Sequence, residues 1–484
     1  MFENGIKSFL EISYDKLEEL NLEAKQRVAN HTSNDDLKEY YVRYLSDEKK
    51  IKALTVCFSD LEGRFHTLDY DKKYLLKSYE NLTFDGSSIH GFTKTRQSDL
   101  RLEIDWGSLR WLPSDIFGPG KVMIFGYILD RNGSGYPADM RGRLKQYCDY
   151  LYNNRQIEAN FSVECEGFLF QGINAEQQFS PSYSNGNDFK LVSTGGYFHS
   201  LPQDPLKRFI DALAEAQRAL GFENEKDHPE VAPSQFELNY RYCNVLLAAD
   251  QVQLYKLTAR QIANSMGMTA CFLPKPVSGL NGSGMHCNFS LNKEGVNLYY
   301  EDTGQDNLSL LAWDAIKRIL CNANPLSLIF SPSVNSYRRL DPRFEAPNKV
   351  YVSSIDRTSM IRIPIGNKES TRLEIRSVAP DANPYMTMYA LLKTSLEGPI
   401  PNDFNLDCFL QQNLSLPANI HDAIESFKSS DFIRDLLGEE ARNNYLERKE
   451  LVANRSPIEL GHYVKRSEVL FHHEVSDQHI WNEF

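Results

Sequence analysis

The chain has 484 residues and 41% hydrophobic content, which is enough for two or more domains and a large core. Its formal net charge of −12 argues against nonspecific binding of nucleic acid, which depends on basic patches. The sequence contains no run of about 18 apolar residues, so it predicts no membrane span. The first residues lack the pattern of a secretory signal. The eight cysteines form no Cys-x-x-Cys pair, so we expect reduced thiols in a cytoplasmic protein.

In chain order, the sequence predicts three parts. Residues 1–50 are rich in Glu, Lys, Leu and Asn with amphipathic spacing, and predict an N-terminal helical extension. Residues 51–139 hold short apolar runs between turns, such as 54–58 and 122–127, and predict a small β-rich domain. In residues 140–484, strands alternate with helices, one of which opens at Asp204 and another of which stops at Gly267. The pattern is typical of an α+β fold.

Four predicted strands carry ionisable side chains on one face and apolar side chains on the other, because neighbouring residues in a strand point to opposite faces. They cover residues 162–166, 235–239, 285–290 and 372–376. Their polar faces hold Glu164, Glu166, Glu237, His286, Arg372, Glu374 and Arg376. If the four strands share one sheet, these faces form a carboxylate-rich trough suited to divalent metals and an anionic substrate.

Glu164 and Glu166 lie two residues apart in a strongly apolar run. Two carboxylates about 4 Å apart repel by roughly 4 kcal/mol at an effective dielectric constant of about 20. A buried pair therefore needs a shared proton or a cation, and a divalent metal meets this need. The segment 228–237 adds Glu230 and Glu237, separated by a loop that prolines restrict.

A glycine-rich turn at residues 281–286 leads into the strand that carries His286. It predicts either a simple hairpin turn or a backbone surface that a substrate approaches closely, followed by a histidine ligand. Arginines are dense around the loop 345–347: Arg338, Arg339, Arg357, Arg362, Arg372 and Arg376. Guanidinium groups bind phosphates and carboxylates through paired hydrogen bonds. Metals beside several arginines indicate phosphoryl transfer.

Together, these segments resemble the glutamine synthetase family. The resemblance extends over about residues 54–399 and includes ordered motifs at 84–92, 281–288, 339–347, 357–364 and 371–384. It implies a β-grasp domain at residues 51–139 and a catalytic domain at 140–484, with a curved antiparallel sheet flanked by helices. It also implies homo-oligomeric rings, a dodecamer by resemblance, with sites at subunit interfaces.

The resemblance implies ATP-dependent ligation of ammonia to the γ-carboxylate of glutamate, through γ-glutamyl phosphate. It also implies two or more divalent ions per site, Mg²⁺ or Mn²⁺. One ion would be held by Glu166, Glu230 and Glu237. The other would be held by Glu164, His286 and Glu374.

The remaining roles follow from the same resemblance. Asp85, from a neighbouring subunit, would take a proton from ammonium, Glu345 would lie on a flap that shields the acyl phosphate, and Arg357 would be catalytic. Substrate would be bound by Ser88, Tyr197, Asn281, Gly282, Arg339 and Arg376. The nucleotide would be bound by Glu225, Ser290, Arg362 and Arg372. The ammonium pocket would consist of Asp85, Ser88, Tyr197, Glu230 and Glu345.

Several positions depart from the family pattern, namely Gly167, His199, Pro229, Phe236, Asn288 and residues 341–343. None of them removes a proposed metal ligand. Phe236 and the altered approach to the flap leave a second interpretation open, a γ-glutamyl ligase for a larger amine such as a polyamine. A third is a catalytically silent oligomeric relative, although a silent protein has no reason to retain every ligand.

Overall fold

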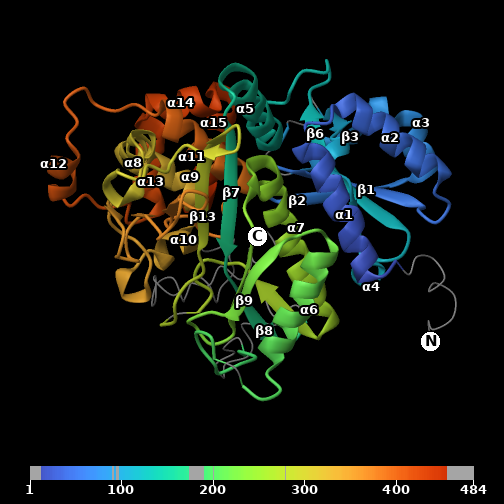
Figure 1. The fold of residues 1–484 in the computed structure, drawn as a ribbon, viewed down its shortest axis with the longest axis horizontal. Helices are drawn as coiled ribbons and strands as arrows, with labels where there is room; N and C mark the ends of the chain where they lie inside the picture. The colour runs from blue at the N-terminus through green and yellow to red at the C-terminus, as the bar shows by residue number, and fades with distance from the viewer. Residues whose placement is uncertain are drawn as a thin grey trace.

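The computed structural model describes residues 12–89, 92–93, 98–173, 190–199, 201–277 and 279–454. Residues 1–11 of the expected extension, residues 455–484 of the expected catalytic domain, and His90 and Gly91 of the motif 84–92 lie outside these ranges. An N-terminal part, drawn in blue, lies beside a larger part (Figure 1). Within the described ranges, no helix combines the length and the apolar composition that crossing a bilayer requires.

The N-terminal part opens with two helices, α1 (Tyr14–Ala29) and α2 (Asn34–Asp47), as the composition of residues 1–50 predicts. Ser13 and Ser33 precede them, and each serine side chain accepts a backbone N–H of the first turn. Asn21 of α1 is fully buried and donates to the carbonyls of Trp111 and Ala219. Through these two hydrogen bonds, helix α1 connects the N-terminal sheet to helix α6 of the larger part.

The N-terminal sheet has six strands in the order β2-β1-β6-β4-β3, with β5 paired to β6. Its strands are β1 (Ala53–Ser59), β2 (Phe65–Asp71), β3 (Leu82–Asp85), β4 (Asp99–Ile104), β5 (Arg110–Trp111) and β6 (Lys121–Leu129), with the short helices α3 (Lys72–Ser78) and α4 (Ser114–Phe117). Strands β1 and β6 are parallel neighbours and the other pairs are antiparallel. The strands predicted at 54–58 and 122–127 are confirmed.

Two sheets form the scaffold of the larger part. One has seven strands in the order β11-β7-β13-β17-β16-β15, with β14 paired to β13, and the other has the order β12-β8-β10-β9. Every pair is antiparallel except β15 with β16. The strands are β7 (Glu158–Cys165), β8 (Gly167–Gln171), β9 (Asn224–Pro229), β10 (Gln235–Tyr240), β11 (Cys243–Asn244), β12 (Met268–Cys271), β13 (Met285–Lys293), β14 (Val296–Asn297), β15 (Val352–Ser353), β16 (Ile361–Arg362) and β17 (Leu373–Ile375).

Helices surround these sheets, and α7 lies near the centre of the molecule (Figure 1). They are α5 (Met140–Arg155), α6 (Pro205–Ala219), α7 (Val245–Ser265), α8 (Leu310–Cys321), α9 (Ala323–Phe330), α10 (Val334–Arg339), α11 (Pro384–Glu397), α12 (Leu406–Gln411), α13 (Ile420–Ser429), α14 (Asp431–Leu437) and α15 (Glu439–Ala453). Helix α7 packs against α6, α11, β7 and β12. The helices predicted from Asp204 and up to Gly267 are confirmed as α6 and α7.

Buried ion pairs join the two parts. Arg141 of α5 pairs with Asp105 of the N-terminal part and with Asp250 of α7, each at 2.7 Å. Glu62, between β1 and β2, pairs with Arg448 at 2.6 Å and Lys449 at 2.8 Å in α15. Removing one partner from such a pair leaves an uncompensated buried charge, so these contacts resist separation of the two parts.

Three of the four polar strands share a sheet, but the fourth does not. Strands β7, β13 and β17 are neighbours in the seven-stranded sheet, whereas β10 belongs to the four-stranded sheet. Glu166 lies between the end of β7 and the start of β8, where the chain passes from one sheet to the other. The expected single trough is therefore wrong for the segment 235–239, and the polar residues meet at a junction of two sheets.

Two departures from the family pattern compensate each other beside this junction. A Cβ atom on Gly167 would lie 2.6 Å from Cζ of Phe236, so the phenylalanine fills the space that the glycine leaves. Phe236 has an exposed fraction of 0% and meets Phe209 and Phe272 edge to face. Because Phe236 belongs to the core, it gives no reason to expect a larger amine.

Candidate active site and metal centre

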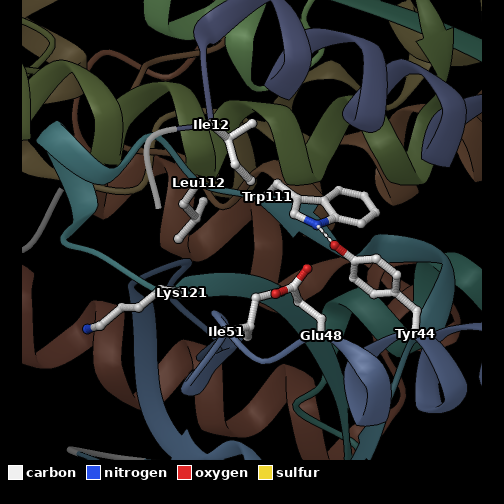
Figure 2. A pocket seen from close by; sticks show the side chains of 7 residues that line it. All are labelled: Ile12, Tyr44, Glu48, Ile51, Trp111, Leu112 and Lys121. Carbon is white, nitrogen blue, oxygen red and sulfur yellow. Dashed lines mark hydrogen bonds between the residues drawn. The ribbon is translucent and has the colours of Figure 1, made fainter. Parts of the chain in front are cut away.

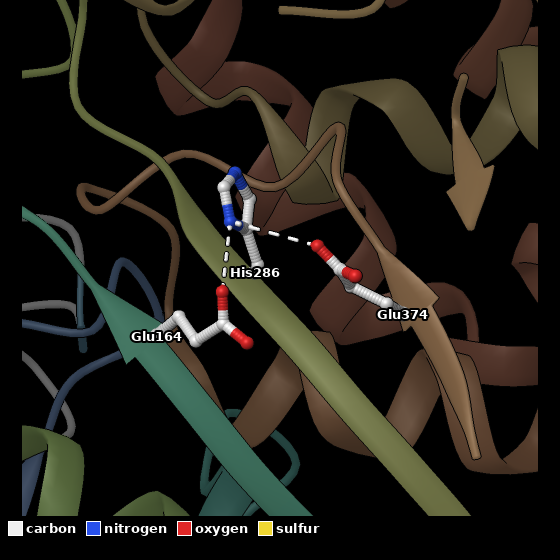
Figure 3. Close-up of side chains that lie close together, drawn as sticks. All are labelled: Glu164, His286 and Glu374. Atoms are coloured by element: carbon white, nitrogen blue, oxygen red, sulfur yellow. Dashed lines mark hydrogen bonds and ion pairs between the residues drawn. The ribbon is translucent and has the colours of Figure 1, made fainter. Parts of the chain in front are cut away.

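Glu164, His286 and Glu374 lie together on three neighbouring strands (Figure 3). In β7, intermediate and buried positions alternate, which places Glu164 on the polar face and Val163 and Cys165 in the core. His286 stands directly opposite Glu164 in the strand register. Its Nδ1 lies 3.4 Å from Oε2 of Glu164 and 3.9 Å from Oε1 of Glu374.

Guanidinium and amide groups hold these carboxylates in place. Glu374, only 1% exposed, accepts hydrogen bonds from Nη1 of Arg376 and, at 2.7 Å, from Nη1 of Arg362. Nδ2 of Asn288 donates to Oε1 of Glu164 at 2.9 Å. Burial and the charge of Arg376 hold the pKa of His286 well below its ordinary value. The imidazole is therefore neutral at pH 7, the form that binds a metal.

A second cluster forms on the hairpin of β9 and β10. His228 stands opposite Glu237 in the register, and its Nε2 lies 3.8 Å from Oε1 of Glu237. The Nδ1 of the same ring lies 3.7 Å from Oε1 of Glu230, which follows β9. In each of the two clusters, one ligand atom per residue can be chosen so that all lie within 4.8 Å of one another.

Burial and repulsion among carboxylates act together on the second cluster. Burial, together with the charge of Glu166, raises the pKa of Glu230 to about 8. Burial and the charges of Glu164 and Glu166 raise the pKa of Glu237 well above its ordinary value. The two clusters therefore lie within electrostatic range of each other, and added positive charge would stabilise both.

Glu166 lies beside the second cluster but outside it. Its Oε2 accepts hydrogen bonds from the backbone N–H of Gly284 at 2.7 Å and from Nε2 of Gln235 at 3.3 Å. Of the expected set Glu166, Glu230 and Glu237, the structure thus groups two acids with His228 instead. The sequence analysis missed His228, although it lies only two residues before Glu230 in the sequence.

The residues present fit divalent ions. Carboxylate oxygens with one imidazole in each cluster form a donor set that suits Mg²⁺ or Mn²⁺. Burial and the neighbouring carboxylates raise the pKa values of Glu230 and Glu237, so a nearby positive charge would stabilise the ionised form of both acids. A bound ion would supply it, and the clusters are accordingly candidate metal sites.

Two glycines of the glycine-rich turn lie where a side chain would collide with other parts of the protein. A Cβ atom on Gly282 would lie 2.4 Å from the carbonyl oxygen of Pro274, and one on Gly284 would lie 2.5 Å from Nε2 of His286. Arg339 also packs there, 2.6 Å from the same Gly284 position. The small residues of the turn thus leave room for a histidine and an arginine side chain.

Arg339 ends helix α10 and is only 2% exposed. Its Nη2 donates to the carbonyl of Arg376 at 2.9 Å, whereas its Nη1 is buried without a hydrogen-bond partner among the described residues. Burial lowers the pKa of Arg339 to about 10, so the side chain is still charged at pH 7. A buried guanidinium with an unused donor is suited to an anion.

Tyr197 and Glu345 lie within electrostatic range of Glu230, and Arg357 is a hydrogen-bond partner of Tyr197. The charge of Glu345 contributes to the raised pKa of Glu230. Burial raises the pKa of Tyr197, the charge of Glu230 raises it further, and a hydrogen bond with Arg357 lowers it. Tyr197 is 45% exposed and meets the ring of His228 edge to face. Glu345 is exposed and adopts a left-handed backbone (φ +61°) after Phe344, whose carbonyl accepts a weak contact from Asn281 at 3.5 Å.

The residues expected at the nucleotide are divided between the two sheets. Ser290 lies on β13, on the face of His286 and Asn288, and Nε of Arg372 donates to Oδ1 of Asn288 at 2.9 Å. Arg362 reaches Glu374, as described above. Glu225 is exposed near the start of β9, in the four-stranded sheet.

Asp85 and Ser88 do not join the clusters of their own chain. Both are exposed at the end of β3, where Asp85 accepts hydrogen bonds from Ser87 and Ser88, which hold the pKa of Asp85 below its ordinary value. Strand β3 lies well apart from β7, β9 and β13 (Figure 1). Any site that combines Asp85 with these metal ligands needs a second chain.

A small pocket in the N-terminal part contains none of the expected site residues (Figure 2). It is lined by Ile12, Tyr44, Glu48, Ile51, Trp111, Leu112 and Lys121. Nε1 of Trp111 donates to the hydroxyl of Tyr44 at 3.0 Å across it. Both candidate metal clusters lie elsewhere, at the junction of the two sheets.

The α+β fold carries two acidic clusters, each of which could hold a divalent ion. Residues 137–459 match the family model of the glutamine synthetase catalytic domain. The chain is 34% identical to a glutamine synthetase from Methanosarcina mazei over 84% of this chain and 91% of that one, and 30% identical to one from Staphylococcus epidermidis over 85% and 93%. The chain belongs to the glutamine synthetase family.

Solved structures agree with this assignment. A complex of GmaS with ADP has 25% sequence identity and a TM-score of 0.73, and the match covers 88% of this chain and 99% of that one. The Plasmodium falciparum glutamine synthetase has 21% identity and a TM-score of 0.76, over 90% and 98% of the two chains. This second likeness concerns the fold alone, and it confirms the expected α+β architecture.

We predict that metal affinity rises with pH between 6 and 8. In the metal-free fold, Glu230 keeps its proton up to about pH 8, and an ion must displace that proton to bind. One released proton corresponds to about a tenfold gain in affinity per pH unit below that value. Titration of metal-free protein with Mn²⁺ at pH 6, 7 and 8 measures this, and affinity independent of pH would contradict it.

The same shift sets the stability of the metal-free fold. Because the pKa of Glu230 is higher folded than unfolded, the unfolded chain releases this proton first, and stability falls as pH rises from about 4.5 to about 8. The variant E230Q has no such proton, so its melting temperature should decline less over that window.

Proposed function

We propose that this chain ligates ammonia to the γ-carboxylate of glutamate, with ATP as the phosphoryl donor and γ-glutamyl phosphate as the intermediate. The observation that carries the proposal is the junction itself, where two metal-binding clusters meet the unused guanidinium donor of Arg339. Phosphoryl transfer to a carboxylate brings several negative charges together, and these groups are arranged to neutralise them. Membership in the glutamine synthetase family supports the same reaction.

Two ions would occupy the clusters. Glu164, His286 and Glu374 would hold one, and Glu230, Glu237 and His228 would hold the other, with Glu166 beside it. When bound, divalent ions neutralise charge on the phosphates and polarise the phosphoryl oxygen. The nucleotide phosphates would also give Arg362, Arg372 and Arg376 partners beyond their present ones, and Ser290 and Glu225 stay proposed nucleotide contacts.

Arg339 would hold the glutamate substrate together with the turn at Asn281 and Gly282. Its buried Nη1 needs an acceptor, and a carboxylate provides one with charge. Arg376 fixes the position of Arg339 by offering its backbone carbonyl at 2.9 Å. Arg357, at the rim beside Tyr197, would meet the phosphate during transfer.

The amine would enter beside Glu230, Tyr197 and Glu345. An anionic pocket favours ammonium, and Asp85 with Ser88 from a neighbouring chain would complete it. The hydrogen bonds from Ser87 and Ser88 keep Asp85 ionised, which suits a group that accepts the proton of ammonium. We therefore propose a homo-oligomer, in rings, with the sites between subunits. The eight free cysteines favour a reducing compartment, the cytoplasm.

A γ-glutamyl ligase for a larger amine is the second candidate, because the segment 341–343 differs from the family pattern next to Glu345. Measurement of ADP release with glutamate, ATP and Mg²⁺ separates the two candidates when ammonium is compared with methylamine, ethanolamine and putrescine. Our proposal predicts turnover that depends on ammonium. A strong preference for a carbon-bearing amine would favour the second candidate, and no ADP release with any amine would favour a silent relative.

We expect E345A to uncouple ADP release from amide formation. Without the flap carboxylate, water reaches the acyl phosphate, so ADP should still appear while the amide yield per ADP falls severalfold. Parallel assays of ADP and glutamine measure this ratio. The variant E369A, on an exposed loop, is the control and should stay coupled, whereas full coupling in E345A would exclude the flap role.

Inactive variants should complement each other if subunits share the site. D85A lacks the proton acceptor and E374Q lacks a metal ligand, so a site that takes Asp85 from one chain and Glu374 from another can be intact in a mixed oligomer. Random mixing should restore about a quarter of the wild-type activity. Mixtures refolded or co-expressed in equal amounts provide the test, and activity that never exceeds that of the separate variants would place the whole site in one chain.

A further inference from the structure

Ser234 adopts a backbone conformation that favours glycine. Its φ is +64° and its exposed fraction is 0%, in the turn that links Glu230 to strand β10. A residue with a Cβ atom is disfavoured there, and such outliers persist where the surroundings stabilise them. The contacts of the side chain show what holds Ser234 in this conformation.

The hydroxyl of Ser234 pairs with both backbone groups of one distant residue. It accepts the N–H of Ser193 at 2.8 Å and donates to the carbonyl of Ser193 at 3.0 Å. The carbonyl of Ser234 in turn accepts the N–H of Leu169 in β8 at 2.9 Å. One buried residue thus joins the segment 190–199 to the strand that follows Glu166.

The segment held in this way runs alongside the turn that carries Glu230. The hydroxyl of Ser193 donates to Asp204 at 2.8 Å and accepts the N–H of Gly195 at 3.2 Å, which shapes the chain after it. Further along, the N–H of Phe198 reaches the carbonyl of Pro229 at 3.3 Å. Tyr197, between these contacts, meets His228 edge to face with ring centroids 5.6 Å apart.

We propose that Ser234 is a positioning residue for the amine subsite, and that its hydroxyl fixes the segment 190–199 so that Tyr197 stands beside Glu230. The inference rests on the proposed function, since Tyr197 and Glu230 face the amine only in that reaction. Ser234 itself touches no substrate. A glycine would satisfy the backbone but would lack the two hydrogen bonds to Ser193.

The variants S234G and S234A separate the backbone from the hydroxyl. Both lose the pairing with Ser193, but glycine relieves the left-handed conformation and alanine keeps it. In both variants we expect KM for the amine to rise about fivefold or more, with kcat and KM for ATP changed less than about twofold. Hydrogen exchange of peptides covering residues 190–199 should be faster in both, and S234G should melt at or above S234A.

S327A provides the matched control. Ser327 is also buried and donates to the carbonyl of Ala323 within helix α9, which carries no residue of either cluster. Its loss should leave the amine KM and exchange in residues 190–199 at wild-type values. Any change in KM or exchange that follows from the loss of a buried hydroxyl in general would appear in this control as well.

Three results would overturn the inference. An unchanged amine KM in S234G would do so, as would unchanged exchange in residues 190–199, or an equal loss in kcat, KM for ATP and KM for the amine. If the wild-type protein releases no ADP with any amine, the proposed function fails. Exchange would then still decide whether Ser234 fixes the segment, because that readout needs no turnover.

Discussion

Mutual repulsion of buried carboxylates is the constraint on which the site depends. Burial raises the pKa values of Glu230 and Glu237, and the neighbouring charges raise them further, from Glu166 on Glu230 and from Glu164 and Glu166 on Glu237. A fold does not gather such groups for its own stability, because each would be more stable in water. Divalent cations bound at the two clusters would make the arrangement favourable, and this is the reason for proposing metal binding there.

The acids come together because two sheets are joined at one residue, Glu166. Strands β7, β13 and β17 carry one cluster, and the β9–β10 hairpin carries the other. Glu166 lies at the crossing, where the chain passes from one sheet to the other. Gly167 and Phe236 fit together in the core next to the crossing, so the chain can turn there without a cavity. The interdomain ion pairs of Arg141 and Glu62 hold the N-terminal part at a fixed position relative to this junction.

Much of this could be predicted from local patterns. The alternation in β7 identified the polar face of Glu164, and strand periodicity placed His286 and Glu374 on matching faces. The sheet that contains β10 could not be predicted, since alternation gives the faces of a strand and not its neighbours. His228 was missed for the same reason, because its closeness to Glu237 depends on the hairpin register.

Two other features could be interpreted only from the positions of atoms in the structure. Gly282 and Gly284 are small because Pro274, Arg339 and His286 occupy the space, which no spacing in the sequence reveals. The expected role of Asp85 involves a second chain, so its distance from the clusters in one chain agrees with the resemblance without testing it. The resemblance supplied glutamate, ammonia and ATP, whereas the residues alone indicated metals, anions and phosphoryl transfer.

The most direct test of the account is a count of the Mn²⁺ ions bound to metal-free protein, followed by electron paramagnetic resonance in wild type, E374Q and E237Q. The account predicts a pair of ions per chain in the wild type, and the loss of a different ion in each variant, because the two acids belong to different clusters. A wild type that binds no ion at these residues, or variants that both retain the full pair, would contradict it.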